Sequence, residues 1–356
     1  MHSHRGRKDA DEVGGTIITP VRLLLSAIAI ALVCCPSRAA MQARFVDDAG
    51  RSVTLPARVG RVFAAGGPAE VMLYTLVPDF LVGRNRLPTA DALEFFPPRY
   101  RQPVVITQLP EVDNPEADED VIALTPDVYI DYGTVEEDYI ASLEAVQRRT
   151  KVPGIILNGE LSRIPAMYRR LGAALGVKER GERLGAVAER MLNKYRGVLA
   201  SGGAPVRVYM ACSNDGQIPC FEDESSGEVL KWLGGINVAG TRAAAPRRAL
   251  TIAEIAALES DVMIVNQSAP AFRKNADWQR VKAAAAGRVY QWPALPNGWG
   301  SRPPSVNRLP GLAWLAYVAR GRRFDAELDT DVRLLFRELY HLELTEQQLQ
   351  KLLALP

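Results

Sequence analysis

Three arginines follow short apolar runs of the sequence and could bind an anion. Arg84 and Arg86 come directly after the run at 81–83, and Arg302 follows the run at 288–292 within a Pro- and Gly-rich stretch. A guanidinium group presents a planar fork of donors that matches a carboxylate or an oxyanion. A solvated surface position is the ordinary alternative for any one arginine. Their shared position after apolar runs favours a ligand-binding role for all three.

Aromatic, amide and small residues occur at comparable positions. Tyr132 and Trp292 end apolar runs, and Trp299 lies in PALPNGWGSRPP, a segment without helical or strand periodicity. Flat rings can form the walls of a site for a bulky ring or chelate. Asn266 also follows a buried run, and Gly67 precedes a helical pattern whose free amides could bind an anion, although a tight turn also explains a glycine there. We predict that all five contribute to a ligand site.

Two cysteines remain outside the first 40 residues. Cys212 and Cys220 are separated by the turn-forming segment SNDGQIP. In an oxidising compartment such a pair can form a local disulfide, whereas two unpaired thiols on a loop are the alternative. We predict the disulfide.

Catalytic and metal-binding motifs are missing from the sequence. It contains no GxSxG, GxxxxGK[ST] or HExxH pattern, and His341 is the one histidine after residue 40. A histidine-rich site for a bare zinc or manganese ion is therefore not available. We predict a protein that is not an enzyme and has neither a cofactor nor a resident metal, so that any metal arrives within a chelate or as an oxyanion.

The charge balance gives no sign of a nucleic-acid partner. The chain has 43 Lys and Arg and 41 Asp and Glu residues, and the first 40 residues hold five of the former and three of the latter. The remainder is formally neutral and has no basic tract, so we predict no nucleic-acid binding.

The elements that must position these residues follow an alternating pattern from residue 41 onward, typical of parallel α/β units. Helical patterns over 162–175 and 178–198 divide the predicted strands into two sets, and another helical pattern covers 333–353. The strands are 61–65, 81–83, 104–107, 128–131 and 154–157, followed by 206–211, 262–266 and 288–292.

This order of elements predicts two α/β lobes with central parallel sheets, joined by one long bridging helix, with a ligand cleft between the lobes. The N-terminal lobe covers 41–161, the bridging segment 162–203, and the C-terminal lobe with its terminal helices 204–356. Ligands of open α/β sheets bind beyond the carboxyl ends of the strands, which also nominates the loops at 132–134 and 158–159.

The two halves share a weak internal similarity. Residues 123–130 (ALTPDVYI) and 257–264 (ALESDVMI) have four identities in eight positions, and each predicts a helix end that leads into a buried strand. Acidic residues precede the shared Ala-Leu pair in both halves, with Glu119 in the first and Glu254 in the second.

The first 40 residues have the composition of a signal peptide. An apolar run over 21–33 follows several basic residues and is too short for a helix that spans a bilayer. An uncleaved anchor is the alternative. Val33 and Cys34 are unfavourable residues before a lipidated cysteine at Cys34 or Cys35, so we predict a soluble periplasmic product.

Several motifs in order resemble one family. The segments FVDDAGRSVTLPARVGRVFAAGGPAEVMLYTL, ALTPDVYI, SSGEVLKWLGGINVA and WQRVKAAAAGRVYQWP are similar to the class III solute-binding proteins of ABC importers, which form the TroA-like superfamily. RPPSVNRLPGLAWLA and LYHLELTEQQLQKLL resemble a subgroup associated with iron uptake.

The resemblance implies two lobes with modest closure, a monomer, and a permease of an ABC importer as partner. It implies an iron-siderophore or similar metal chelate as ligand; haem, cobalamin, molybdate or tungstate, or a sensor on the same scaffold, are the alternatives. In the cobalamin-binding relatives a glutamate on each lobe meets a permease arginine. Glu119 and Glu254 occupy those places, although helix-start acids are also common for the sake of the helix dipole.

Overall fold

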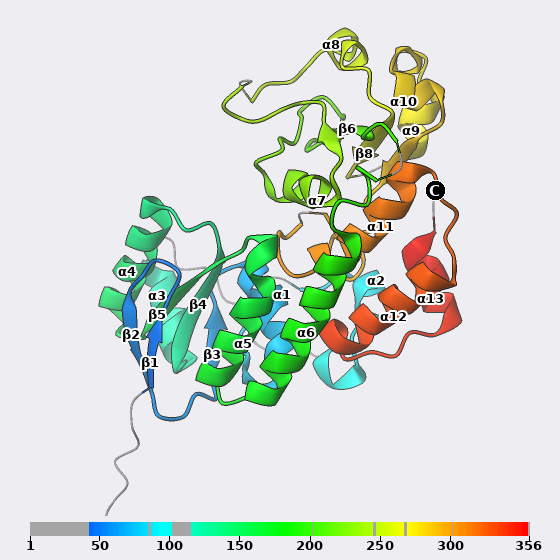
Figure 1. Ribbon diagram of the computed structural model, residues 1–356. Helices are drawn as coiled ribbons and strands as arrows, with labels where there is room; N and C mark the ends of the chain where they lie inside the picture. Colours follow the sequence, from blue (N-terminus) through cyan, green and yellow to red (C-terminus); the bar gives the residue numbers. More distant parts are fainter. Residues whose placement is uncertain are drawn as a thin grey trace, which may run out of the picture. The chain divides into compact units, whose positions relative to one another are not determined.

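A computed structural model describes residues 43–84, 87–101, 115–201, 203–244, 247–266, 269–300 and 302–354 (Figure 1). The predicted leader at 1–40, the predicted strand at 104–107 and Arg86 lie outside the described residues. None of the described helices combines the length and apolar character needed to cross a membrane.

The first sheet is parallel and has the strand order β3-β4-β5, formed by β3 (Val62–Ala64), β4 (Val128–Gly133) and β5 (Gly154–Asn158). Of the strand predicted at 81–83, the described residues show one parallel bridge, from Leu81 to Val62, with the Val82 amide donating to the Val62 carbonyl at 3.1 Å.

Each strand of this sheet is buried on both faces. Phe63, Tyr129 and Ile156 pack in one core with residues of α3 (Pro115–Ala123) and α4 (Glu137–Thr150). Alternate strand residues, including Ile130 and Ile155, pack in a larger core with α1 (Gly67–Leu76) on the opposite face. Figure 1 shows α3 and α4 on one side of the sheet and α1 on the other. Such strands appear as continuous apolar runs in the sequence, which is why they could be predicted.

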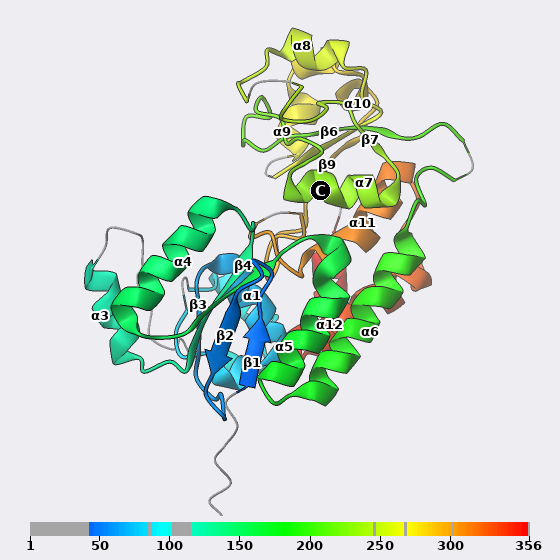
Figure 2. The same cartoon turned by 60° about the vertical axis from the view of Figure 1, so that its left-hand side comes forward.

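An antiparallel hairpin not predicted from the sequence precedes this sheet. It consists of β1 (Ala43–Val46) and β2 (Ser52–Leu55), which Figure 2 shows as two neighbouring strands. The Asp48 amide in the hairpin turn donates to the carbonyl of Ile156 in β5 at 3.0 Å. The buried carboxylate of Asp47 accepts hydrogen bonds from the Ala49 and Arg51 amides and closes the turn.

The second sheet is also parallel, with the order β7-β6-β8-β9. The predictions at 206–211, 262–266 and 288–292 are confirmed by β6 (Arg207–Met210), β8 (Val262–Val265) and β9 (Val289–Gln291). The two-residue strand β7 (Ile236–Asn237) was not predicted. Short helices surround the sheet: α7 (Ser225–Leu233), α8 (Ile252–Ala257), α9 (Ala269–Lys274) and α10 (Lys282–Ala285). The chain thus has the predicted α/β architecture, and we call the parts around the two sheets the first and second lobes.

The internal similarity extends to the hydrogen bonds of the two lobes. Thr125 and Glu259, which correspond in the two copies, both have a positive φ, at 44° and 50°. In each lobe an arginine side chain donates to the carbonyls just beyond the end of a helix. Arg61 does so at residues 124 and 125, after α3, and Arg207 does so at residues 258 and 259, after α8. The aspartate two residues after the positive φ accepts the backbone amide of that same arginine in both lobes.

Two antiparallel helices connect the lobes, α5 (Ile164–Ala174) and the longer α6 (Lys178–Tyr195). The predicted interruption at Gly176 is confirmed, and its φ of +75° favours glycine. The two helices can pack closely because Gly181 has no side chain. A Cβ at this position would lie 2.5 Å from the carbonyl oxygen of Tyr168.

Three helices end the chain: α11 (Arg308–Arg320), α12 (Ala326–Tyr340) and α13 (Glu346–Leu353). The helical pattern predicted over 333–353 is confirmed by α12 and α13, which are separated at His341, whose φ is 55°, and Thr345 forms a capping box with Gln348 at the start of α13. Phe336 packs edge-on against Phe95, and the Tyr74 hydroxyl donates to the Tyr340 carbonyl at 3.1 Å. Helices α12 and α13 therefore cover α1 and α2 (Ala90–Leu93) of the first lobe.

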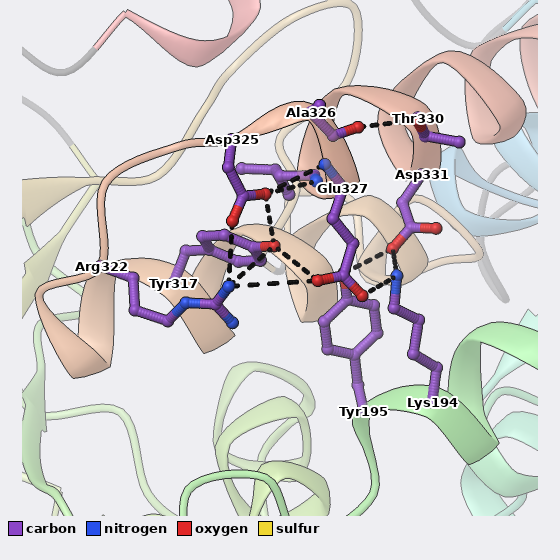
Figure 3. Close-up of polar contacts among 10 residues, drawn as sticks. Lys194, Tyr195, Tyr317, Arg322, Asp325, Ala326, Glu327, Thr330 and Asp331 are labelled. Atoms are coloured by element: carbon purple, nitrogen blue, oxygen red, sulfur yellow. Dashed lines mark hydrogen bonds and ion pairs between the residues drawn. The ribbon is translucent and has the colours of Figure 1, made fainter.

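A polar network fixes α12 to the bridging helix α6 (Figure 3). The buried carboxylate of Asp331 accepts hydrogen bonds from Lys194 at 2.5 Å and from the Tyr195 hydroxyl at 2.6 Å. At the start of α12, Asp325 caps the helix and accepts a hydrogen bond from the Tyr317 hydroxyl of α11. Besides the turn at Pro78–Phe80, the described residues form 3-10 turns at Pro98–Tyr100, Leu161–Arg163 and Trp278–Arg280.

Candidate functional site

A cavity of about 660 Å³ lies between the carboxyl ends of the strands of the two lobes. Its wall combines the start of α1, the segment around residue 84, the end of β8 and the Pro-rich segment 292–303. Five of the eight residues that the sequence nominated line it: Gly67, Arg84, Asn266, Trp292 and Arg302.

Gly67 begins α1, which follows an extended N-cap at Gly66 and carries a proline in its first turn. A Cβ on Gly67 would lie 3.3 Å from the Cβ of Pro303, so glycine lets the Pro-rich segment approach the helix start. At this point the cavity wall is formed by the backbone at the start of α1 and by Pro303 of the Pro-rich segment.

Arg84 is buried, with 8% of its surface exposed. Its Nε lies 2.9 Å from Oε1 of Glu70, and its guanidinium lies 5.3 Å from the centre of the Phe96 ring. Glu70 and Phe96 also line the cavity, and neither was predicted to do so. The charge of Arg84 is thus balanced by a carboxylate of the protein itself, which makes the residue a structural part of the wall.

Arg302 differs from Arg84 because its side chain is exposed. Its Nη2 donates to the carbonyl oxygen of Cys212 at 2.8 Å, and no carboxylate within the described ranges forms an ion pair with it. Arg302 therefore brings an unneutralised positive charge to the cavity, while one of its donors is already anchored to the backbone.

Asn266 and Trp292 complete the predicted set. The amide nitrogen of Asn266 donates to the carbonyls of Ala211 and Cys212 at 3.1 and 3.2 Å. Trp292 packs against Trp314 with ring centres 5.1 Å apart, and a Cβ on Gly300 would lie 2.6 Å from its indole ring. The absence of a side chain at Gly300 is what allows the ring to lie against the backbone there.

Two nominated aromatic residues do not line the cavity. Tyr132 is 1% exposed and lies within β4, and its burial raises the pKa of its hydroxyl to about 12. Trp299 is fully buried, and its indole nitrogen donates to the Leu295 carbonyl at 2.8 Å. Both rings are core residues, because their segments turn these side chains away from the cavity.

A second cavity, of about 850 Å³, contains the nominated loops at 133–134 and 158–159. The buried Arg308 lines it, pairs with Glu228 at 2.6 Å and donates to the Gly159 carbonyl, so it links the lobes. Acidic residues outnumber basic ones among its lining residues, which are Glu136, Glu160, Glu222, Asp223, Glu224 and Glu228 against Arg196, Lys231 and Arg308. An anion is therefore better matched by the first cavity.

The predicted disulfide is present. Cys212 and Cys220 are bonded, with their Cα atoms 5.0 Å apart. Cys220 is buried, and Cys212 lies directly beyond the end of β6 beside Asn266 and Arg302.

The two nominated acids lie away from the cavity. Glu119 is exposed on α3. Glu254 forms a capping box with Thr251 at the start of α8 and pairs with Arg248 at 2.5 Å. The hydrogen bond from Arg248, with those from Thr251, lowers the pKa of the Glu254 carboxyl to about 2. The structure thus gives Glu254 a local role in its helix, independent of any partner.

Comparison with known proteins identifies a family. Residues 72–295 match the family model described as periplasmic binding protein. A search of curated protein sequences gave no match.

Solved structures with the same fold include three binding proteins. An ABC transporter solute-binding protein from Sulfurospirillum deleyianum has 22% identity and a TM-score of 0.75, over 87% of this chain and 98% of its own. The Haemophilus influenzae protein MolA, bound to molybdate, has 18% identity and a TM-score of 0.67, over 85% and 99%. The periplasmic heme-binding protein RhuT from Roseiflexus has 18% identity and a TM-score of 0.55, over 74% and 98%.

Proposed function

Because this chain belongs to the periplasmic binding protein family, we propose that it captures an anionic metal chelate, first of all an iron-siderophore, and delivers it to the permease of an ABC importer. The observation that carries the proposal is the exposed guanidinium of Arg302 beside the apolar wall of the 660 Å³ cavity. Such a wall suits the organic body of a chelate, and the guanidinium suits its negative charge.

The size of the cavity favours a chelate over a bare oxyanion. Cavities for organic ligands commonly measure roughly 300 to 1,000 Å³, and this one falls within that range. A single molybdate ion would occupy a small part of it and would leave the rings of Phe96 and Trp292 without contact. The cavity size therefore supports a chelate ahead of an oxyanion such as the molybdate bound by the Haemophilus protein.

The composition of the wall also disfavours haem. Haem iron is usually held by His, Cys, Met or Tyr. Among the described residues, the lining of the cavity includes none of these four types. A chelate whose metal is already fully coordinated needs no such ligand.

Delivery to a permease requires an accessible surface on each lobe. Glu119 and Glu254 lie on α3 and α8, the helices that precede the corresponding strands β4 and β8. We propose that they form the docking pair, on a protein exported to the periplasm by a signal peptide at 1–40. A sensor role on the same scaffold is the alternative, and a permease and an ATPase gene beside this reading frame would favour import.

The ligand can be identified directly from protein purified from the periplasm. Native mass spectrometry with metal analysis should find iron together with the mass of an organic chelator. In titrations, ferric citrate should bind more tightly than ferrichrome, a neutral ferric chelate. Recovery of molybdenum without a chelator, or equal affinity for the charged and the neutral chelate, would contradict the proposal.

A further inference from the structure

Two residues of the cavity wall depend on one backbone carbonyl. The oxygen of Cys212 accepts hydrogen bonds from Nη2 of Arg302 at 2.8 Å and from Nδ2 of Asn266 at 3.2 Å. These residues come from two different segments of the chain, one after β9 and one after β8. The Cys212 carbonyl therefore helps to orient both side chains, that of Asn266 together with the Ala211 carbonyl at 3.1 Å.

The disulfide holds that carbonyl in place, together with the hydrogen bond that the Cys212 amide donates to the Ile218 carbonyl at 2.7 Å. Cys212 is half-buried at the start of a loop, whereas Cys220 is 3% exposed and belongs to the large core. Cys220 is itself fixed, because its amide donates to the Met210 carbonyl at 2.8 Å and its carbonyl accepts Nδ2 of Asn237 at 2.9 Å. The bond between the sulfurs ties the loop residue to this fixed one across a separation of eight residues.

The anchoring determines which atoms are left for a ligand. Among the described residues, both side-chain hydrogen bonds of Asn266 are donated by its amide nitrogen, which leaves its side-chain oxygen to accept from a ligand. Arg302 has an exposed, flexible side chain, and a fixed partner removes part of the conformational entropy that binding would otherwise cost. Preorganisation of this kind raises affinity without any new contact.

We propose that the Cys212–Cys220 disulfide is a positioning element of the anion site, so that its reduction releases Arg302 and Asn266 and weakens ligand binding. The binding part of this inference rests on the proposed function. In the reduction, a dithiol such as dithiothreitol supplies two electrons and two protons. Its own sulfurs join in a ring, and Cys212 and Cys220 become thiols.

The release of Arg302 can be measured without any ligand. Phenylglyoxal modifies arginine side chains, and the extent at each residue can be read from peptide masses. In the reduced protein and in the double variant C212S/C220S, Arg302 should react on the order of threefold faster or more, the factor expected for loss of one hydrogen bond. Arg61 is the matched control, because it is also exposed and also donates to backbone carbonyls, but in the first lobe. Unchanged reactivity at Arg302, or an equal rise at Arg61, overturns the inference.

The effect on binding is tested with ferric citrate in a double-mutant cycle. Reduction should weaken binding to the wild-type protein by about three- to tenfold and should have a clearly smaller effect on Arg302→Ala, because the anchored group is then missing. A purely structural disulfide would weaken both proteins equally, which would overturn the inference. If ferric citrate binds neither protein, the proposed ligand class is wrong, and the reactivity of Arg302 still decides the role of the disulfide.

Discussion

Two arginines of the same cavity carry the same charge in different surroundings. Arg84 is buried and paired with Glu70, whereas Arg302 is exposed and bonded to a neutral carbonyl. The charge of Arg84 is balanced within the wall, because the Glu70 carboxylate lies close to it. The charge of the second is left for an external anion, and this difference leads to opposite predictions for the two residues.

Replacing Arg302 should affect binding, and replacing Arg84 should affect mainly stability. Arg302→Ala is expected to lower the affinity for ferric citrate about ten- to a hundredfold, the range for a charge-assisted hydrogen bond. Arg84→Ala leaves Glu70 without this partner in the wall and should lower the free energy of unfolding by roughly 1 to 3 kcal/mol. Calorimetric titration and urea unfolding separate the two effects. Wild-type affinity in Arg302→Ala would rule out the anionic-ligand model.

A half-buried histidine makes stability depend on pH. His341 ends α12 against Tyr74, and its Nε2 lies 3.2 Å from the Tyr74 carbonyl. Burial, with the nearby charge of Arg180, lowers its pKa from 6.5 to about 4. Between those values the unfolded chain binds a proton that the folded chain does not, so stability falls as the pH falls through this window.

The contribution of His341 should appear as a difference between two proteins. His341→Asn keeps a residue that tolerates the positive φ and removes the titrating group. From about pH 7 to about pH 4.5, the wild type should lose roughly 1 to 2 kcal/mol more unfolding free energy than the variant, allowing for partial exposure. Urea unfolding at both pH values checks this. Equal losses in the two proteins would show that His341 does not titrate as expected.

The direction of a side chain was the part of the site that the sequence did not reveal. The rule for strand ends located the cavity, because apolar runs mark strands and parallel strands end at one edge. It could not show that Tyr132 lies within β4 facing the core, or that Trp299 turns inward to donate to Leu295. Glu70 and Arg84 are likewise far enough apart along the chain that no local pattern signals their pairing.

At the scale of elements, the most specific prediction was the similarity between 123–130 and 257–264. The structure extends it to the same positive φ and the same arginine and aspartate contacts in both lobes. Buried parallel strands were predictable because both of their faces are apolar. The hairpin β1–β2 and the two-residue β7 were not, since they are short and depend on pairing with distant segments.

The contact between α6 and α12 should depend on one buried carboxylate (Figure 3). Asp331→Asn removes the charge that pairs with Lys194, although Lys194 keeps Glu327 at 2.9 Å and Tyr195 keeps an acceptor. We expect a loss of roughly 1 to 3 kcal/mol in unfolding free energy. The exposed pair of Arg322 and Asp325 provides the control, and Arg322→Gln should cost less than about 1 kcal/mol. If urea unfolding showed the same loss of unfolding free energy for Asp331→Asn and Arg322→Gln, the buried position of Asp331 would not strengthen its ion pair.

At the scale of the whole molecule, the two lobes should act together on the permease. The double charge reversal Glu119→Arg with Glu254→Arg should leave the affinity for ferric citrate unchanged and abolish uptake in cells, because like charges would meet at the interface. Glu254→Gln is the control for the helix, since glutamine preserves the capping box. Normal uptake by the double variant at normal protein levels would exclude this docking model.

The return of the C-terminal helices to the first lobe has a consequence for the order in which the protein can form. Tyr74 and Phe95 belong to early parts of the described chain, but Phe336 and Tyr340, which cover them, belong to α12 and are synthesised much later. A nascent chain therefore cannot close the core of its first lobe before α12 has been made.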